Sequence, residues 1–166
     1  MSNPKYTSKY PTLEEDIAAG RVIGDTSTLA FKIARKNWES YCVHDLDGLG
    51  DVYDENAIIV SPAGEIRGHP KAKAFSENWY KAFTNGHYEL LRTYTAGEFT
   101  IHEFKWKEDH TGVFKLPGVP EKKPEGATFY SRGAQILQVK DGKIVREELY
   151  WDNLTFVQQV GYKVVP

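Results

Sequence analysis

Apolar residues recur at helical spacing in the first half of the chain and alternate with polar residues in the second half. Residues 25–28 offer several N-cap side chains. They precede a stretch whose apolar side chains return every three or four positions: Leu29, Ala30, Ile33, Ala34, Trp38, Tyr41 and Cys42. This spacing predicts an amphipathic helix. A brief second helix is predicted around residues 46–53, and a short strand at 57–61.

A third helix is predicted to begin at residues 68–70, because proline is accepted in a first helical turn. Its apolar face comprises Ala72, Phe75, Trp79, Ala82 and Phe83. Asn85-Gly86 is expected to end it. From residue 87 the pattern predicts strands at 87–96, 98–107, 127–139 and 143–152, with the turn at 140–143 joining the last two as a hairpin. Helices followed by antiparallel strands predict the α+β class.

Residues 1–24 form a polar segment with two prolines and no lasting hydrophobic period. We expect an N-terminal arm that is loose or packs on a neighbour, with at most a short helix at 13–19. Residues 25–166 are then expected to form one domain, because a chain of 166 residues is long enough for a single sizeable core.

The composition argues against two classes of partner. The 21 basic and 23 acidic side chains are interspersed and give a net charge of −2, so nucleic acid and anionic membranes are not expected as partners. No apolar leader precedes the first helix, and no apolar run is long enough to cross a bilayer. The single cysteine, Cys42, is compatible with a reducing compartment. We therefore expect a cytoplasmic protein.

Candidate chemistry gathers on the last predicted strand. Strict alternation would place Ile144, Arg146, Glu148, Tyr150 and Asp152 on one face, and Val145, Glu147, Leu149 and Trp151 on the other. Asp152 stands at the end of this strand beside two aromatic residues, where desolvation could raise its pKa for use as a general acid or base. It also precedes the last predicted helix and could simply cap it. Both interpretations remain open.

Other ionisable groups extend this candidate site. Arg132 on the preceding strand could pair with a carboxylate and polarise a water molecule. Glu148 could contact a ligand or form a surface ion pair with Arg146. His102 and His110 could move protons near neutral pH, or each could be a structural histidine. No motif for a metal, nucleotide or other cofactor is present, so none is expected.

Aromatic residues make up 13% of the chain and could line a pocket for a flat organic ligand. The candidates on helices are Trp38, Tyr41, Trp79 and Phe83, which could equally form core. On the strands, Phe104 shares the face of His102, while Tyr130 and Tyr150 could donate hydroxyl hydrogen bonds to an oxyanion. The long loop at 111–127, with Phe114 and Leu116, is either a lid or a plain connection.

Several short motifs occur in order between residues 28 and 161. They are LGDVYDENA at 49–57, IRG at 66–68, HTG at 110–112, RG at 132–133, DGKIV at 141–145, YWD at 150–152 and QQVG at 158–161. In order and spacing they resemble the SnoaL-like polyketide cyclases and ester cyclases of the nuclear transport factor 2-like superfamily. The sequence departs from the family pattern at Glu108-Asp109, where members commonly have Gly-Thr, and has no histidine between residues 127 and 139.

The resemblance implies a cone-shaped fold, in which a strongly bent antiparallel sheet wraps around three or four helices and encloses an apolar cavity. It also implies a homodimer and a small hydrophobic organic ligand. In polyketide cyclases of this type an acidic residue near the last strand acts as acid and base in an aldol closure, without metal or organic cofactor. Asp152 is at the matching position.

Three hypotheses follow. The first is a cofactor-independent acid/base enzyme, a cyclase or isomerase acting on a hydrophobic carbonyl compound, with Asp152, Arg132, His102 and Tyr150 as its catalytic set. The second is an epoxide or lactone hydrolase of the limonene epoxide hydrolase type, which requires Arg132 and Asp152 around an enclosed water. The third is a non-catalytic binding or dimerisation module, which requires Asp152 to cap the last helix without access to a cavity.

Overall fold

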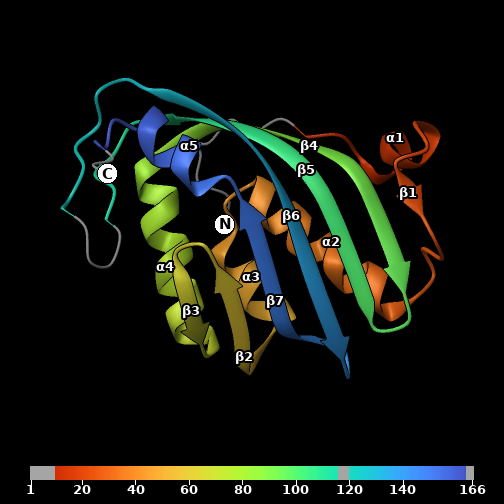
Figure 1. Ribbon diagram of the computed structural model, residues 1–166. Helices are drawn as coiled ribbons and strands as arrows, with labels where there is room; N and C mark the ends of the chain where they lie inside the picture. The colour runs from red at the N-terminus through yellow and green to blue at the C-terminus, as the bar shows by residue number, and fades with distance from the viewer. Residues whose placement is uncertain (1–9, 116–119, 164–166) are drawn as a thin grey trace.

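The computed structural model describes residues 10–115 and 120–163, and in this part of the chain a curved sheet packs against helices (Figure 1). The described helices are α1 (Leu13–Ala18), α2 (Leu29–Cys42), α3 (Leu46–Val52), α4 (His69–Ala82) and α5 (Asn153–Gln159). The described strands are β1 (Val22–Ile23), β2 (Tyr53–Ser61), β3 (Gly64–Arg67), β4 (Phe83–Ala96), β5 (Phe99–His110), β6 (Thr128–Lys140) and β7 (Lys143–Trp151). The predicted α+β class is confirmed.

The strands form one sheet in the order β1-β4-β5-β6-β7-β2-β3. The four long strands β4 to β7 are an antiparallel meander, whereas β1 joins β4 and β2 joins β7 in parallel. Figure 1 shows the long strands arching over α2, α3 and α4, which lie on the concave side, with α5 following the end of β7. The cone-like arrangement expected from the resemblance is therefore present, with five helices in the described residues instead of three or four.

Local side chains explain where the helices begin. The Thr28 hydroxyl accepts a hydrogen bond from the Phe31 amide at the start of α2, and Asp45 accepts from two amides at the start of α3. Pro70 lies in the first turn of α4. Backbone amides in a first turn have no hydrogen-bond partner within the helix, so proline, which lacks the amide hydrogen, is accepted there. These starts confirm the three helices predicted from the hydrophobic pattern.

The end of α4 differs from the prediction. The helix ends at Ala82, and Phe83 is already the first residue of β4. Asn85-Gly86 lies inside that strand, where Asn85 has a positive φ of 55° and the pairing with β5 shifts between Thr84 and His87. The dipeptide therefore forms a bulge in a strand and does not cap a helix. Asn-Gly is common both at the ends of helices and in strand bulges, so the sequence pattern alone did not distinguish the two.

The last hairpin has the predicted turn but not the predicted alternation. Asp141 and Gly142 both have positive φ, as a tight two-residue hairpin turn requires. Val139 pairs with Ile144 and Gln138 pairs with Arg146, which leaves Val145 as an extra residue on β7. Because this bulge resets the alternation, Ile144 is buried together with Glu147 on the concave face. Strict alternation had placed Ile144 on the opposite face, which is wrong.

Residues 10–24 are attached to the rest of the fold. β1 pairs with the edge of β4, and α1 buries Asp16 completely. The Asp16 carboxylate accepts hydrogen bonds from Arg35 at 2.6 Å and from Arg21 at 2.8 Å. None of the helices in the described residues is long and apolar enough to cross a membrane.

Candidate active site

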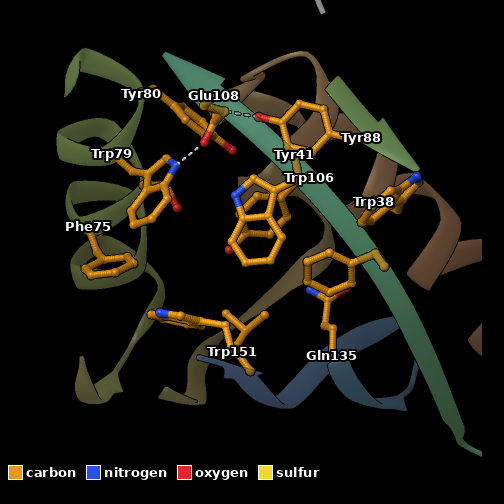
Figure 2. Close-up of a pocket in the computed structure, with 13 residues that line it drawn as sticks. Trp38, Tyr41, Phe75, Trp79, Tyr80, Tyr88, Trp106, Glu108, Gln135 and Trp151 are labelled. Carbon is orange, nitrogen blue, oxygen red and sulfur yellow. Dashed lines mark hydrogen bonds between the residues drawn. The ribbon is translucent and has the colours of Figure 1, made fainter. Parts of the chain in front are cut away.

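An aromatic pocket lies between the concave face of the sheet and helices α2 and α4 (Figure 2). Its walls comprise Trp38, Tyr41, Phe75, Ser76, Trp79, Tyr80, Tyr88, Phe104, Trp106, Glu108, Gln135, Leu149 and Trp151. The cavity measures about 90 Å³. All four tryptophans of the chain line it. The curvature of the sheet brings these side chains together, since they come from two helices and from all four long strands.

Glu108 is the one carboxylate among these lining residues, and its side chain is fully buried. The Trp79 indole N–H donates to Oε2 at 2.8 Å, and the Tyr88 hydroxyl donates to Oε1 at 2.5 Å. His44 Nε2 lies 3.1 Å from the same Oε1. Figure 2 shows the carboxylate between Trp79 and Tyr88, at the upper end of the pocket. A buried carboxylate is tolerated only with such partners.

His44 contacts the Glu108 carboxylate but is not among the residues that line the pocket. It follows α2 with a positive φ of 54°, a conformation that histidine adopts more readily than most residues. Its ring stacks on Tyr80 with 3.8 Å between ring centroids. Burial lowers the pKa of His44, and the adjacent Glu108 carboxylate only partly opposes this effect. The lowered pKa favours the neutral imidazole at pH 7.

A ring of four buried polar side chains lies behind another wall of the pocket. Asn37 Nδ2 donates to the Tyr53 hydroxyl at 3.0 Å, and Tyr53 donates in turn to Glu147. Gln135 Nε2 closes the ring by donating to Glu147 Oε1 and, at 2.9 Å, to Asn37 Oδ1. Burial raises the pKa of Glu147. Of the four, only Gln135 is among the residues that line the pocket.

The chain matches known proteins in its domain family and in its fold. A SnoaL-like domain model matches residues 36–147, which is more than half of the chain. The chain belongs to the SnoaL-like domain family. No curated protein sequence matches significantly.

Solved structures show that the SnoaL-like chain has the nuclear transport factor 2-like fold. A candidate SnoaL-like polyketide cyclase from Jannaschia sp. CCS1 is 13% identical, with a TM-score of 0.71 over 85% of this chain and 97% of that one. IdmH, a candidate polyketide cyclase from Streptomyces antibioticus, is 20% identical, with a TM-score of 0.63 over 80% and 99%. A protein from Catenulispora acidiphila with a ketosteroid isomerase-like fold, solved with trimethylamine, is 16% identical, with a TM-score of 0.62 over 81% and 98%.

Four residues predicted to contact a ligand line the SnoaL-like pocket. They are Trp38, Tyr41, Trp79 and Phe104. Sequence reasoning missed Glu108, His44, Tyr88, Gln135 and Glu147. A signal for Glu108 was present, because alternation along β5 places it on the same face as Phe104 and Trp106. Its importance depends on Tyr88 and His44, which are distant in sequence.

Asp152 lies outside this pocket, at the start of α5. Its carboxylate accepts hydrogen bonds from the Thr155 amide at 2.9 Å and from the Thr155 hydroxyl at 2.5 Å. The side-chain hydrogen bond from Thr155 is the main cause of its lowered pKa. Asp152 is exposed, so the capping alternative is the one that the structure shows.

Arg132 and Tyr130 are exposed on the outer face of β6, and with Asp152 they line a separate open groove. The three residues thus meet in an open groove, whereas the hydrolase hypothesis requires Arg132 and Asp152 around an enclosed water. Alternation along β6 turns Phe129, Gln135 and the other odd-numbered core positions inward, which leaves Tyr130 and Arg132 outside.

Glu148 and Tyr150 also face outward. The Tyr150 hydroxyl donates to Glu148 at 2.6 Å, and Arg146 forms an ion pair with the same carboxylate at 2.7 Å. This is the surface pairing that the sequence left open as an alternative. Neither residue lines the aromatic pocket.

The two predicted histidines are buried but do not line the pocket. His102 Nδ1 lies 2.9 Å from the Thr93 hydroxyl, and burial lowers the pKa of the ring to about 4. His110 packs against Phe83, with 5.2 Å between ring centroids. Burial lowers the pKa of His110 as well. Both positions fit the structural alternative.

Phe83 and Phe114 belong to a second core under α5, together with Phe129 and Phe156. Phe114 is fully buried there, so it does not close over the aromatic pocket as a lid. Leu116, the other predicted lid residue, lies outside the described residues. Within residues 10–115 and 120–163, no three His, Cys, Asp or Glu side chains gather in an arrangement that could hold a metal ion.

Proposed function

We propose that this SnoaL-like protein is an acid/base enzyme that transfers a proton within a hydrophobic carbonyl compound, as in cyclisation or isomerisation. The observation that carries the proposal is the fully buried Glu108 carboxylate in the wall of the aromatic pocket. Family membership supports a cyclase-type function coarsely. The expected independence from metals and organic cofactors stays a prediction.

Glu108 has the surroundings of a general base. Its environment is aromatic, and hydrogen bonds from Trp79, Tyr88 and His44 orient the carboxylate. In the proposed step the carboxylate takes a proton from the carbon next to the carbonyl group, and the electron pair moves onto the carbonyl oxygen to form an enolate. In isomerisation Glu108 then returns the proton to carbon or oxygen. In cyclisation the enolate carbon attacks a second carbonyl carbon of the same molecule, and Glu108 returns the proton to the alkoxide oxygen that this attack forms.

Trp106 is the proposed partner of the developing oxyanion. Its indole lies in the middle of the pocket in Figure 2, between Trp79 and the sheet. An indole N–H in a site that excludes water can stabilise negative charge on oxygen. His44 and Tyr88 are positioning residues, because both contact Glu108 Oε1 and orient the carboxylate.

The charge of the walls restricts the ligand. Within the described part of the chain none of the lining residues is lysine or arginine, and Glu108 supplies a negative charge. An anionic ligand would therefore be repelled without a compensating cation. This supports a neutral ligand, with aromatic or alicyclic surface that can stack on the tryptophans.

The test uses 2-tetralone, a neutral bicyclic ketone with acidic α-hydrogens, in D₂O. We expect the wild-type protein to accelerate deuterium incorporation above the buffer rate, measured by proton NMR. Glu108→Gln should lower the enzyme-dependent rate at least about 100-fold, because loss of a general base typically has this effect. The matched control is Glu148→Gln on the outer face, which should retain the wild-type rate. A folded Glu108→Gln protein with full exchange would contradict the proposal.

A second candidate function is ligand binding without chemistry. The capping role of Asp152 favours this function. Asp152 is at the position that matches the catalytic acid of the family, and a carboxylate that caps a helix outside the pocket does not act on a ligand there. In that case 2-tetralone would quench the fluorescence of the pocket tryptophans without any exchange. The hydrolase alternative has no such support, because Arg132 is exposed and does not enclose a water site with Asp152.

A further inference from the structure

The Gln135 side chain presents an unused hydrogen-bond acceptor at the pocket wall. Gln135 lines the pocket and is only 2% exposed. Its carbonyl oxygen, Oε1, is buried and has no hydrogen-bond partner in the structure of the described residues. Buried polar atoms are nearly always paired, and leaving one unpaired costs about 1–3 kcal/mol. An acceptor maintained at this position therefore needs an explanation.

The hydrogen-bonded ring behind the pocket determines which end of the amide faces the ligand. Gln135 Nε2 is occupied twice, by the Glu147 carboxylate and by Asn37 Oδ1. Asn37 is oriented in turn because its Nδ2 donates to the Tyr53 hydroxyl. Rotating the Gln135 amide by half a turn would direct its carbonyl oxygen at two acceptors. The ring thus reserves the amide nitrogen for the protein and leaves the carbonyl oxygen for another donor.

We propose that Gln135 is a specificity-determining residue, and that the substrate carries a hydroxyl group that donates to Gln135 Oε1. This rests on the proposed function, and it narrows the substrate class to hydroxylated hydrophobic carbonyl compounds. A site built to accept a hydrogen bond from a substrate hydroxyl discriminates strongly against the analogue that lacks it, since the buried acceptor then stays unpaired.

The positions of the two polar groups orient such a substrate. Gln135 pairs in register with His102, near the start of β5, whereas Glu108 lies close to the end of that strand. Figure 2 shows Glu108 and Gln135 on opposite sides of the pocket, with aromatic rings between them. The substrate carbonyl is therefore placed near Glu108 and the hydroxyl at the far end, near Gln135.

Three matched probes test the proposal on the wild-type protein by isothermal titration calorimetry: 2-tetralone, 6-hydroxy-2-tetralone and 6-methoxy-2-tetralone. We expect the hydroxylated ketone to bind at least about 10-fold more tightly than 2-tetralone, a factor within the range of one buried hydrogen bond. The methoxy compound should show no such gain, because it has the oxygen but no donor. Equal affinities for all three, or no binding of any, would overturn the proposal.

A substitution of Gln135 tests whether this residue causes the preference for the hydroxylated ketone. Gln135→Met keeps a side chain of similar length without the amide, and should reduce the preference for the hydroxylated ketone to below about 2-fold. Gln138→Met, the same exchange on the outer face of β6, is the control and should keep the preference. A preference that persists in Gln135→Met overturns the proposal. If the probes show the preference but no protein-dependent deuterium exchange, the proposed function fails and the specificity assignment stands.

Discussion

Two buried histidines illustrate how surroundings decide the role of a residue. His102 contacts the Thr93 hydroxyl and the Ala34 carbonyl oxygen, both of which are uncharged. His44 contacts the Glu108 carboxylate and the Tyr88 hydroxyl at the pocket. The first ring fills the core behind Trp38, and the second orients a carboxylate. Residue type alone did not separate these roles, because both rings are buried and both have lowered pKa values.

The lowered pKa of His102 makes stability depend on pH. The folded protein protonates this ring only near pH 4, whereas the unfolded chain does so near the ordinary value of 6.5. Between these values the unfolded state binds more protons, so stability is full above pH 6.5 and falls as the pH falls toward 4. The expected loss from this residue is about 3 kcal/mol.

Urea unfolding at pH 7.5 and pH 4.5 measures this loss. His102→Gln should have a shallower pH dependence than the wild type, whatever its absolute stability. His87→Gln, at an exposed position, should have the wild-type slope. Equal slopes in all three proteins would show that His102 titrates normally in the folded state.

At the scale of elements, the junction of β7 and α5 determines what Asp152 does. β7 ends at Trp151 and α5 begins at Asn153, so Asp152 is the residue between them. A side chain in this position can turn into a cavity or back onto the first helical amides. Here it turns to Thr155, and the helix it caps covers the second aromatic core through Phe156.

Two substitutions separate a cap from a catalyst at this junction. Asp152→Ala should destabilise the protein by about 1 kcal/mol, since it removes an N-cap acceptor. Asp152→Asn should stay within about 0.5 kcal/mol of the wild type, because asparagine caps about as well as aspartate. Chemical denaturation gives both values, and the 2-tetralone exchange rate should be unchanged in both. A folded Asp152→Asn protein without exchange activity would restore the catalytic interpretation.

At the scale of the molecule, one curved sheet supports two aromatic clusters that meet at Trp106, and a pocket lies between the sheet and α2 and α4. Residues 10–24 pack against this fold, although the match to the family model begins only at residue 36. Asp16 links it to α2 through Arg35, whose side chain is itself nearly buried. The expected homodimer stays a prediction.

The Asp16–Arg35 contact should contribute strongly to global stability. Asp16→Asn removes the buried one of the two carboxylates that pair with the Arg35 guanidinium, the other being that of Glu39, and is expected to cost about 3 kcal/mol of unfolding free energy. Asp51→Asn breaks an exposed ion pair with Lys36 and should cost less than about 1 kcal/mol. Urea denaturation compares the two. Similar small losses would mean that α1 contributes little to the folded state.

Much of the architecture was predictable from local patterns. The helices at 29–42 and 69–82, the hairpin turn at Asp141-Gly142 and the long strands follow from hydrophobic spacing and turn residues. The bulges at Asn85-Gly86 in β4 and at Val145 in β7 were not predictable, and the second changed the face that Ile144 occupies. A bulge arises from pairing with a neighbouring strand, so a single strand carries little trace of it.

The sequence by itself determined the α+β class and most of the secondary structure, and it left open whether Trp38, Tyr41 and Trp79 line a pocket or form core. Local spacing encodes the class and the elements, because they depend on which face a residue occupies along its own element. Only the tertiary structure decided that Glu108 meets Tyr88 and His44, that Gln135 is oriented by Glu147 and Asn37, and that Asp152 remains outside. These outcomes depend on the curvature of the sheet and on contacts between residues far apart in the chain, which the pattern of one element does not contain.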